Sequence, residues 1–102
     1  MNKIPYEARK EIYQKALSKF GLLSQMVVAL EELSECQKEI CKYLRGTADF
    51  DHLAEEIADA TIMLEQLRLA LDLNNAVSQK MDEKIQRLEE RLKLAGGAED
   101  GK

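Results

Sequence analysis

The chain lacks a long apolar run and contains only one proline. No stretch approaches the roughly 18 apolar residues that a membrane span requires. The first five residues lead into a charged segment and not into the apolar region of a signal peptide. We therefore expect a cytoplasmic protein without a membrane span. A single proline among 102 residues, with 33% charged residues, is typical of one ordered domain.

Positive charge is also scarce, because 15 Lys and Arg stand against 19 Asp and Glu, for a formal net charge of -4. Nucleic-acid polymers and anionic membranes are bound through an excess of Lys and Arg. The composition therefore argues against both partners. A small anionic ligand would need a bound metal ion to offset the charge of the protein.

Cysteine and histidine are too few for the common sites built from them. Cys36 and Cys41 are five positions apart, which on a helix separates them by about 7.5 Å along the axis and turns them to different sides. We expect two reduced, structural thiols and no disulfide, since C-x-x-C is absent. His52 is the only histidine, and we interpret it as a surface residue at a helix start. A di-iron carboxylate bundle normally needs two E-x-x-H ligand sets, so it is disfavoured.

Apolar residues recur at three- and four-residue steps in four segments, which predicts an all-α chain. Helices are expected at about 5–19 and 22–44, then from a cap at Asp49 or Asp51 to about 71, and finally around an apolar seam from 77 to 92. A turn is predicted at 73–75. The expected architecture is a four-helix antiparallel bundle formed by one domain over residues 1–94, followed by a flexible tail at 95–102.

The third predicted helix is apolar on two sides. One stripe contains Leu53, Ile57, Ala60, Leu64, Leu67 and Leu71, and the other contains Ala58, Ile62 and Leu69. A helix of this kind needs neighbours on both sides. Because about 90 residues bury a limited apolar area, we expect a homodimer or homotetramer. Between the stripes lies a band with His52, Glu56, Asp59 and Met63, so the acidic pair is predicted to face a packed region.

Acidic residues pair at three-residue spacing on the second and third predicted helices. Glu32 and Glu35 form one pair, and Glu56 and Asp59 form the other, so each pair lies on one helix face. Antiparallel neighbouring helices would bring the four carboxylates together. Like charges in one place are unfavourable unless a cation neutralises them, and hard oxygen ligands select a hard cation such as Mg²⁺.

The paired motifs resemble those of the MazG-like all-α nucleoside triphosphate pyrophosphohydrolases, which carry E-E-x-x-E, a spacer and E-x-x-D. The matching segments are residues 31–35 (EELSE) and 56–59 (EIAD), and the similarity extends over about 20–92. The resemblance implies that Glu32, Glu35, Glu56 and Asp59 bind Mg²⁺, with Mn²⁺ as a substitute. It also implies conversion of a nucleoside triphosphate to a monophosphate and pyrophosphate, with the clearing of non-canonical nucleotides as the use of this reaction.

Residue positions also suggest candidates for the proton acceptor and for the contacts to the nucleotide. Glu31, Glu32 and Glu35 are the candidate proton acceptors for an attacking water, and the sequence does not rank them; Glu31 and Glu39 also fit plain surface charges. Gln25 lies seven residues before Glu32 and so on nearly the same helix face. It is either a contact to the base or sugar of a nucleotide or a surface amide. Candidate phosphate contacts are Lys84 and Arg87, which resemble a late K-x-x-R element in the family and also fit ordinary surface charges.

A non-catalytic reading competes with the enzyme. In it the acidic motifs are solvated helix faces, and the apolar stripes serve only to assemble a helical oligomerisation or interaction module. The two readings differ in one physical respect. A carboxylate cage gains stability when Mg²⁺ binds the folded state, whereas the interaction module predicts no effect of divalent ions.

Overall fold

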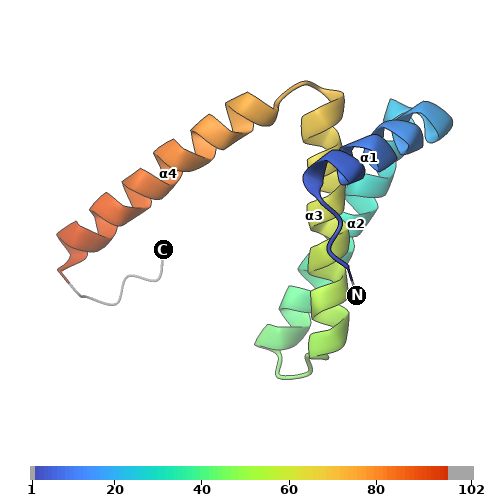
Figure 1. The fold of residues 1–102 in the computed structure, drawn as a ribbon. Coiled ribbons are helices and arrows are strands. Elements are labelled where there is room, and N and C mark those ends of the chain that lie inside the picture. The colour runs from blue at the N-terminus through green and yellow to red at the C-terminus, as the bar shows by residue number, and fades with distance from the viewer. Residues whose placement is uncertain (1, 97–102) are drawn as a thin grey trace. The chain divides into compact units, whose positions relative to one another are not determined.

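The computed structural model describes residues 2–96, which are helical apart from residues 2–5 and the short connections between helices (Figure 1). The helices are α1 (Tyr6–Phe20), α2 (Leu22–Leu44), α3 (Phe50–Ala70) and α4 (Asn74–Ala95). The predicted all-α class is therefore confirmed. Within the described range, no helix combines the length and the apolarity that crossing a membrane requires. Of the tail predicted at 95–102, Ala95 ends α4 and Gly96 caps it, while 97–102 lie outside the described residues.

The chain divides into two compact units, residues 1–72 with α1 to α3 and residues 73–102 with α4. In the first unit α2 and α3 lie side by side and run in opposite directions, and α1 packs against both (Figure 1). Three packed helices are thus shown. The antiparallel arrangement of all four helices stays a prediction.

A tight connection at residues 45–49 turns the chain from α2 into α3. Gly46 has φ +78°, a left-handed conformation that glycine adopts without a steric penalty. Asp49 is the N-cap of α3, and its side chain accepts hydrogen bonds from the backbone N–H groups of Asp51 (3.0 Å) and His52 (3.3 Å). The sequence left Asp49 and Asp51 as alternatives, and the structure selects Asp49.

The α1 helix is attached to α3 by polar contacts around a buried aromatic ring. Tyr13 is buried, and its hydroxyl donates a hydrogen bond to Glu65 on α3. Arg9 forms an ion pair with the same carboxylate at 3.3 Å. Burial, together with the bond to Glu65 and its negative charge, raises the pKa of Tyr13 to about 12.

The face of α3 that packs is the band between the two predicted apolar stripes. Met63 of this band is buried, together with Gln66 and with Ala60 of the first stripe, whereas Ile57 and Leu64 of that stripe stay 48% and 46% exposed. Glu56 in this band is half-buried, as predicted, whereas Asp59 is exposed, and both carboxylates approach Glu32 of α2. Both apolar stripes lie at the flanks of the band, and within this unit neither is fully covered.

The connection before α4 differs from the prediction. Asn74 and Asn75 form the first residues of α4 and not a turn at 73–75. The chain turns at Leu71 and Asp72 instead. Asp72 has φ +54°, and aspartate is among the few residues that visit this region readily. A turn made by a non-glycine residue in a left-handed conformation carries little sequence signal, which explains the error.

Candidate metal centre

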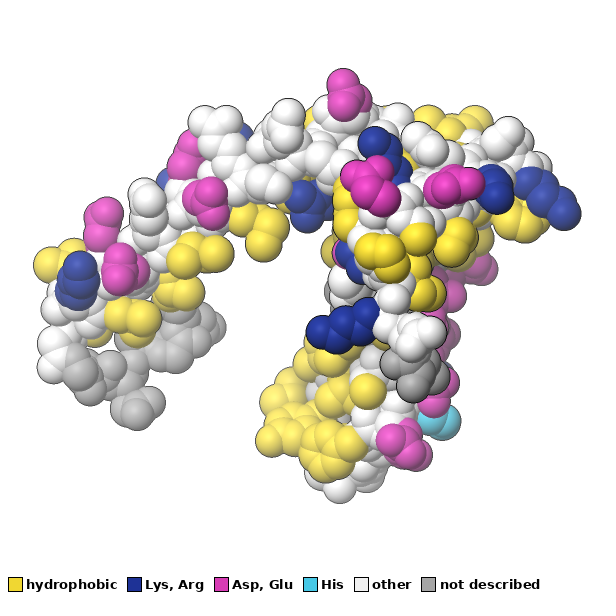
Figure 2. Space-filling model, in the orientation of Figure 1, with side chains coloured by type: hydrophobic (Ala, Val, Ile, Leu, Met, Phe, Trp, Pro, Cys, Tyr) yellow, Lys and Arg dark blue, Asp and Glu magenta, His cyan; other side chains and the backbone are white. Residues whose placement is uncertain are grey.

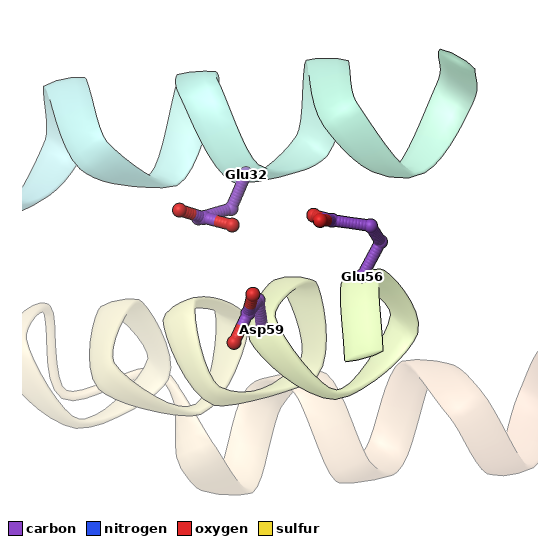
Figure 3. A group of neighbouring side chains, drawn as sticks. All are labelled: Glu32, Glu56 and Asp59. Carbon is purple, nitrogen blue, oxygen red and sulfur yellow. The ribbon is translucent and has the colours of Figure 1, made fainter. Parts of the chain in front are cut away.

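Three of the four predicted metal ligands come together between α2 and α3. A carboxylate oxygen from each of Glu32, Glu56 and Asp59 lies within 4.8 Å of the others. Figure 3 shows Glu32 reaching from α2 toward the two α3 side chains. Oxygens bound to one octahedral Mg²⁺ lie roughly 3 to 4.2 Å apart, given Mg–O distances of about 2.1 Å. Small side-chain rotations would therefore suffice to place all three oxygens on one ion.

The surroundings of Glu32 and Glu56 disfavour their negatively charged forms. Burial raises the pKa of Glu32, and the nearby charges of Asp59 and Glu56 raise it further. Burial likewise raises the pKa of Glu56, followed by repulsion from Asp59 and then Glu35. Both carboxyl groups thus hold a proton more readily than a free glutamate does. A cation among them would relieve the same repulsion.

Two carboxylate oxygens, one in this group and one on a neighbouring glutamate, lack a hydrogen-bond donor among the described residues. One is Oε2 of Glu56 and the other is Oε1 of Glu39, and both atoms are buried. The other oxygen of Glu39, Oε2, pairs with Lys42 at 3.0 Å. A buried acceptor without a donor is unfavourable, and more so when it carries a charge. Such atoms favour a bound cation.

Glu39 was read from the sequence as a possible surface charge, and that reading is wrong. The residue is only 5% exposed, and its charge contributes to the raised pKa of Glu56. The signal was present in the sequence. Glu39 follows Glu32 by seven residues and Glu35 by four, so all three share one face of α2.

The other members of the first motif lie at the edge of the group. Glu35 is exposed and is not one of the three clustered ligands, although its charge helps to raise the pKa of Glu56. Glu31 is exposed and acts on Glu32 in the same sense. The predicted four-carboxylate cage is therefore a group of three with Glu35 nearby, and the catalytic roles of Glu31, Glu32 and Glu35 stay predictions.

Gln25 is not a surface amide. It is 8% exposed, and its Nε2 donates a 2.9 Å hydrogen bond to Oε1 of Gln66 across the α2–α3 contact. Sequence reasoning missed Gln66, which follows Asp59 by seven residues and so shares its helix face. The Gln25–Gln66 pair therefore extends the polar contact between α2 and α3, which we call the α2–α3 seam, beyond the three carboxylates. A role for Gln25 in substrate binding stays a prediction.

The remaining predicted residues lie away from the three carboxylates along the chain. Lys84 and Arg87 are exposed on α4, in the second unit. His52 is exposed at the start of α3, as predicted. Both cysteines are free thiols, as predicted, but Cys41 is exposed and only Cys36 is half-buried.

The residues and geometry of the group suit a hard divalent cation bound through oxygen atoms, a chemistry that many unrelated proteins share. Searches of protein-family models, curated proteins and solved structures found no match to this chain.

Proposed function

We propose that this protein is a Mg²⁺-dependent nucleoside triphosphate pyrophosphohydrolase whose metal centre contains Glu32, Glu56 and Asp59. One observation carries the proposal: three carboxylates from two helices meet within 4.8 Å, beside a buried oxygen of Glu56 that lacks a donor. The spacing of the two acidic motifs adds support for this reaction class, because it resembles that of the MazG-like enzymes. Glu35 is proposed as a further ligand, and Mn²⁺ as a substitute ion.

The charge balance supports a metal-bridged substrate. A nucleoside triphosphate is strongly anionic. The group of three between α2 and α3 consists only of carboxylates, so it offers the phosphates no positive charge. Direct contact would be repulsive. When bound, Mg²⁺ supplies the positive charge that holds the phosphates and stabilises the transition state.

The protein side chains then have two tasks. Glu32, Glu56 and Asp59 would hold the ion, which would supply positive charge to the phosphates. Glu35, Glu31 or Glu32 accepts the proton of a water that attacks the α-phosphorus, while the bond from the α-phosphorus to the bridging oxygen breaks and pyrophosphate leaves. Glu35 is best placed of these candidates, because it is exposed to water and still close enough to act on Glu56.

Substrate contacts outside the metal centre are also proposals. Lys84 and Arg87 carry the positive charge that outer phosphates or the leaving pyrophosphate would need. Gln25 could reach a base or sugar only by exchanging its present partner, Gln66. A homodimer or homotetramer is proposed as the active form, and removal of non-canonical nucleotides as its use.

The test is release of pyrophosphate from a panel of canonical and modified nucleoside triphosphates with Mg²⁺, repeated with excess EDTA. Asp59→Asn and Glu32→Gln remove one ligand each with little change in shape. Glu55→Gln is the matched control, because Glu55 is an exposed carboxylate on α3 outside the group of three. Release that EDTA and Asp59→Asn abolish, and Glu55→Gln preserves, would support the proposal. No release across the panel would contradict it.

A non-catalytic oligomerisation module is the second candidate, favoured by the exposed apolar side chains. Leu44, Phe50 and Leu23 are 78%, 68% and 77% exposed, and Figure 2 shows hydrophobic side chains gathered on the first unit. This candidate predicts no change in melting temperature with Mg²⁺. The enzyme predicts an increase.

A further inference from the structure

The α4 helix carries an apolar stripe that its own unit cannot cover. Met81, Ile85, Leu88 and Leu92 are 50%, 58%, 41% and 60% exposed, and Figure 2 shows hydrophobic side chains along one side of this helix. The second unit contains only this one described helix. A single amphipathic helix has no interior, so its apolar side needs a partner.

The spacing of the stripe is that of a coiled coil. The four residues follow one another at steps of four, three and four, which corresponds to heptad positions d, a, d and a. Ile85 then occupies a and Leu88 occupies d. A β-branched residue at a with leucine at d favours two parallel strands.

Charges of opposite sign flank the stripe on its two sides. In the same register Lys84 and Arg91 occupy g positions, and Asp82 and Glu89 occupy e positions. One edge of the apolar surface is therefore basic and the other edge is acidic. The basic edge borders an open groove lined by Met81, Lys84, Ile85, Leu88 and Arg91.

We propose that α4 pairs with α4 of a second copy of this chain to form a parallel, two-stranded coiled coil. In a parallel pair a g residue faces the e residue five positions further along the partner, so Lys84 faces Glu89 of the partner subunit twice by symmetry. An antiparallel pair would place g opposite g and bring Lys84 against Arg91 of the partner subunit. The charge pattern thus selects both a second copy as the occupant and the parallel direction.

The inference does not depend on the proposed function, but it replaces the phosphate contact proposed there for Lys84. It assigns Lys84 to the contact between subunits. Arg87 lies on the opposite side of α4 from Ile85, two positions and about 200° away, and remains the candidate for phosphate. The apolar stripe from Met81 to Leu92 spans fewer than two heptads, so association through it alone is expected to be weak.

The experiment measures self-association of the full-length chain by sedimentation equilibrium at low ionic strength, from low to high micromolar concentration. Lys84→Glu and Glu89→Lys each convert two attractive contacts into repulsive ones, and each is expected to weaken dimerisation roughly tenfold. A 1:1 mixture of the two variants restores attraction in both contacts and should dimerise about as well as the unmodified chain. Glu90→Lys is the matched control, since it makes the same charge change at an outer position.

Three results would overturn the proposal. A chain that stays monomeric at every concentration does not use the stripe for self-association. A dimer that is insensitive to both charge reversals uses another surface. A dimer that Lys84→Glu strengthens is antiparallel, because the new glutamate would then face Arg91 of the partner subunit. Circular dichroism confirms folding of each variant, and the rescue in the mixture requires that both variants fold.

Discussion

Two glutamates on α3 have opposite surroundings, although both are half-buried. Glu65 receives a hydrogen bond from Tyr13 and an ion pair from Arg9 at 3.3 Å. Glu56 has no donor for its buried Oε2 among the described residues and faces Asp59, Glu35 and Glu39. The same helix therefore holds one carboxylate that is satisfied by the protein and one that is suited to a ligand from outside.

The comparison extends to the rest of the α2–α3 seam. Toward α1, Gln25 and Gln66 satisfy one another, and Ala29 and Met63 fill the space with apolar atoms. Further along, the seam becomes a group of like charges. We infer that the end near α1, with Tyr13, Glu65 and the two glutamines, maintains the fold, and we call it the structural end. The end with Glu32, Glu56 and Asp59 is less stable than it could be and is suited to bind a cation; we call it the ligand end.

The largest effect is expected at the ligand end. Asp59→Asn and Glu32→Gln should reduce the rate of pyrophosphate release by at least about 100-fold, because each removes a charged ligand from the ion. Glu65→Gln, at the other end of α3, should change the melting temperature more than the rate per folded molecule. Steady-state kinetics with parallel thermal melts separates the two effects. Equal rate losses at both ends would remove the distinction between them.

At the structural end, Tyr13→Ala should destabilise the first unit by about 3 kcal/mol, because it removes a buried ring and leaves Glu65 with one partner fewer. Tyr13→Phe retains the ring and should cost about 1 kcal/mol. Urea unfolding followed by circular dichroism measures both values. A Tyr13→Ala variant as stable as the unmodified chain would show that α1 does not depend on this contact.

Mg²⁺ should stabilise the protein through the ligand end only. At a concentration ten times the dissociation constant, the melting temperature should rise by about 5 to 10 °C. Glu56→Gln should largely abolish this increase, whereas the control Glu55→Gln should retain it. An increase of equal size in both variants would place the bound ion elsewhere, and EDTA should reverse any increase that is specific.

The smallest expected effect is a pH dependence of the metal-free protein. The pKa values of Glu32 and Glu56 are raised in the folded state above the ordinary value of 4.5, so the folded chain binds more protons than the unfolded chain between the ordinary and the raised values. Stability contributed by these groups is therefore greatest below about pH 4.5 and falls as pH rises through that window.

Urea unfolding in EDTA between pH 4.5 and 8 measures this dependence. Glu56→Gln should flatten the decline, because it removes one of the two raised carboxyl groups. Saturating Mg²⁺ should oppose the decline, since the ion replaces the protons as the source of positive charge. A stability that rises over the same window in EDTA would contradict the raised pKa values.

Local features could be predicted from the sequence with good accuracy. The boundaries of α1, α2 and α3 agree with the structure to within about one residue, and Asp49 was one of two caps considered. Glu56, in a band between two apolar stripes, was correctly predicted to face a packed region, whereas Asp59 is exposed. These features depend on periodicity and on hydrogen bonds between near neighbours, which a single segment specifies.

Other features depend on what lies opposite a residue. Glu39 resembles any solvent-facing glutamate until α3 covers it, and Gln25 gains its partner Gln66 from another helix. The turn at Asp72 was missed because several residue types form such turns.

The sequence by itself determined the four helical segments, the acidic pairs on α2 and α3, and the heptad and charge pattern of α4, because each is a repeat along one helix. Only the tertiary structure decided that the polar band of α3 packs on α2 and that Glu32 meets Glu56 and Asp59 while Glu35 stays at the edge. It also decided that Glu56 and Glu39 each keep a buried oxygen without a donor. The reason is physical: periodicity defines a face, but the rotation and register of two packed helices define which atoms meet.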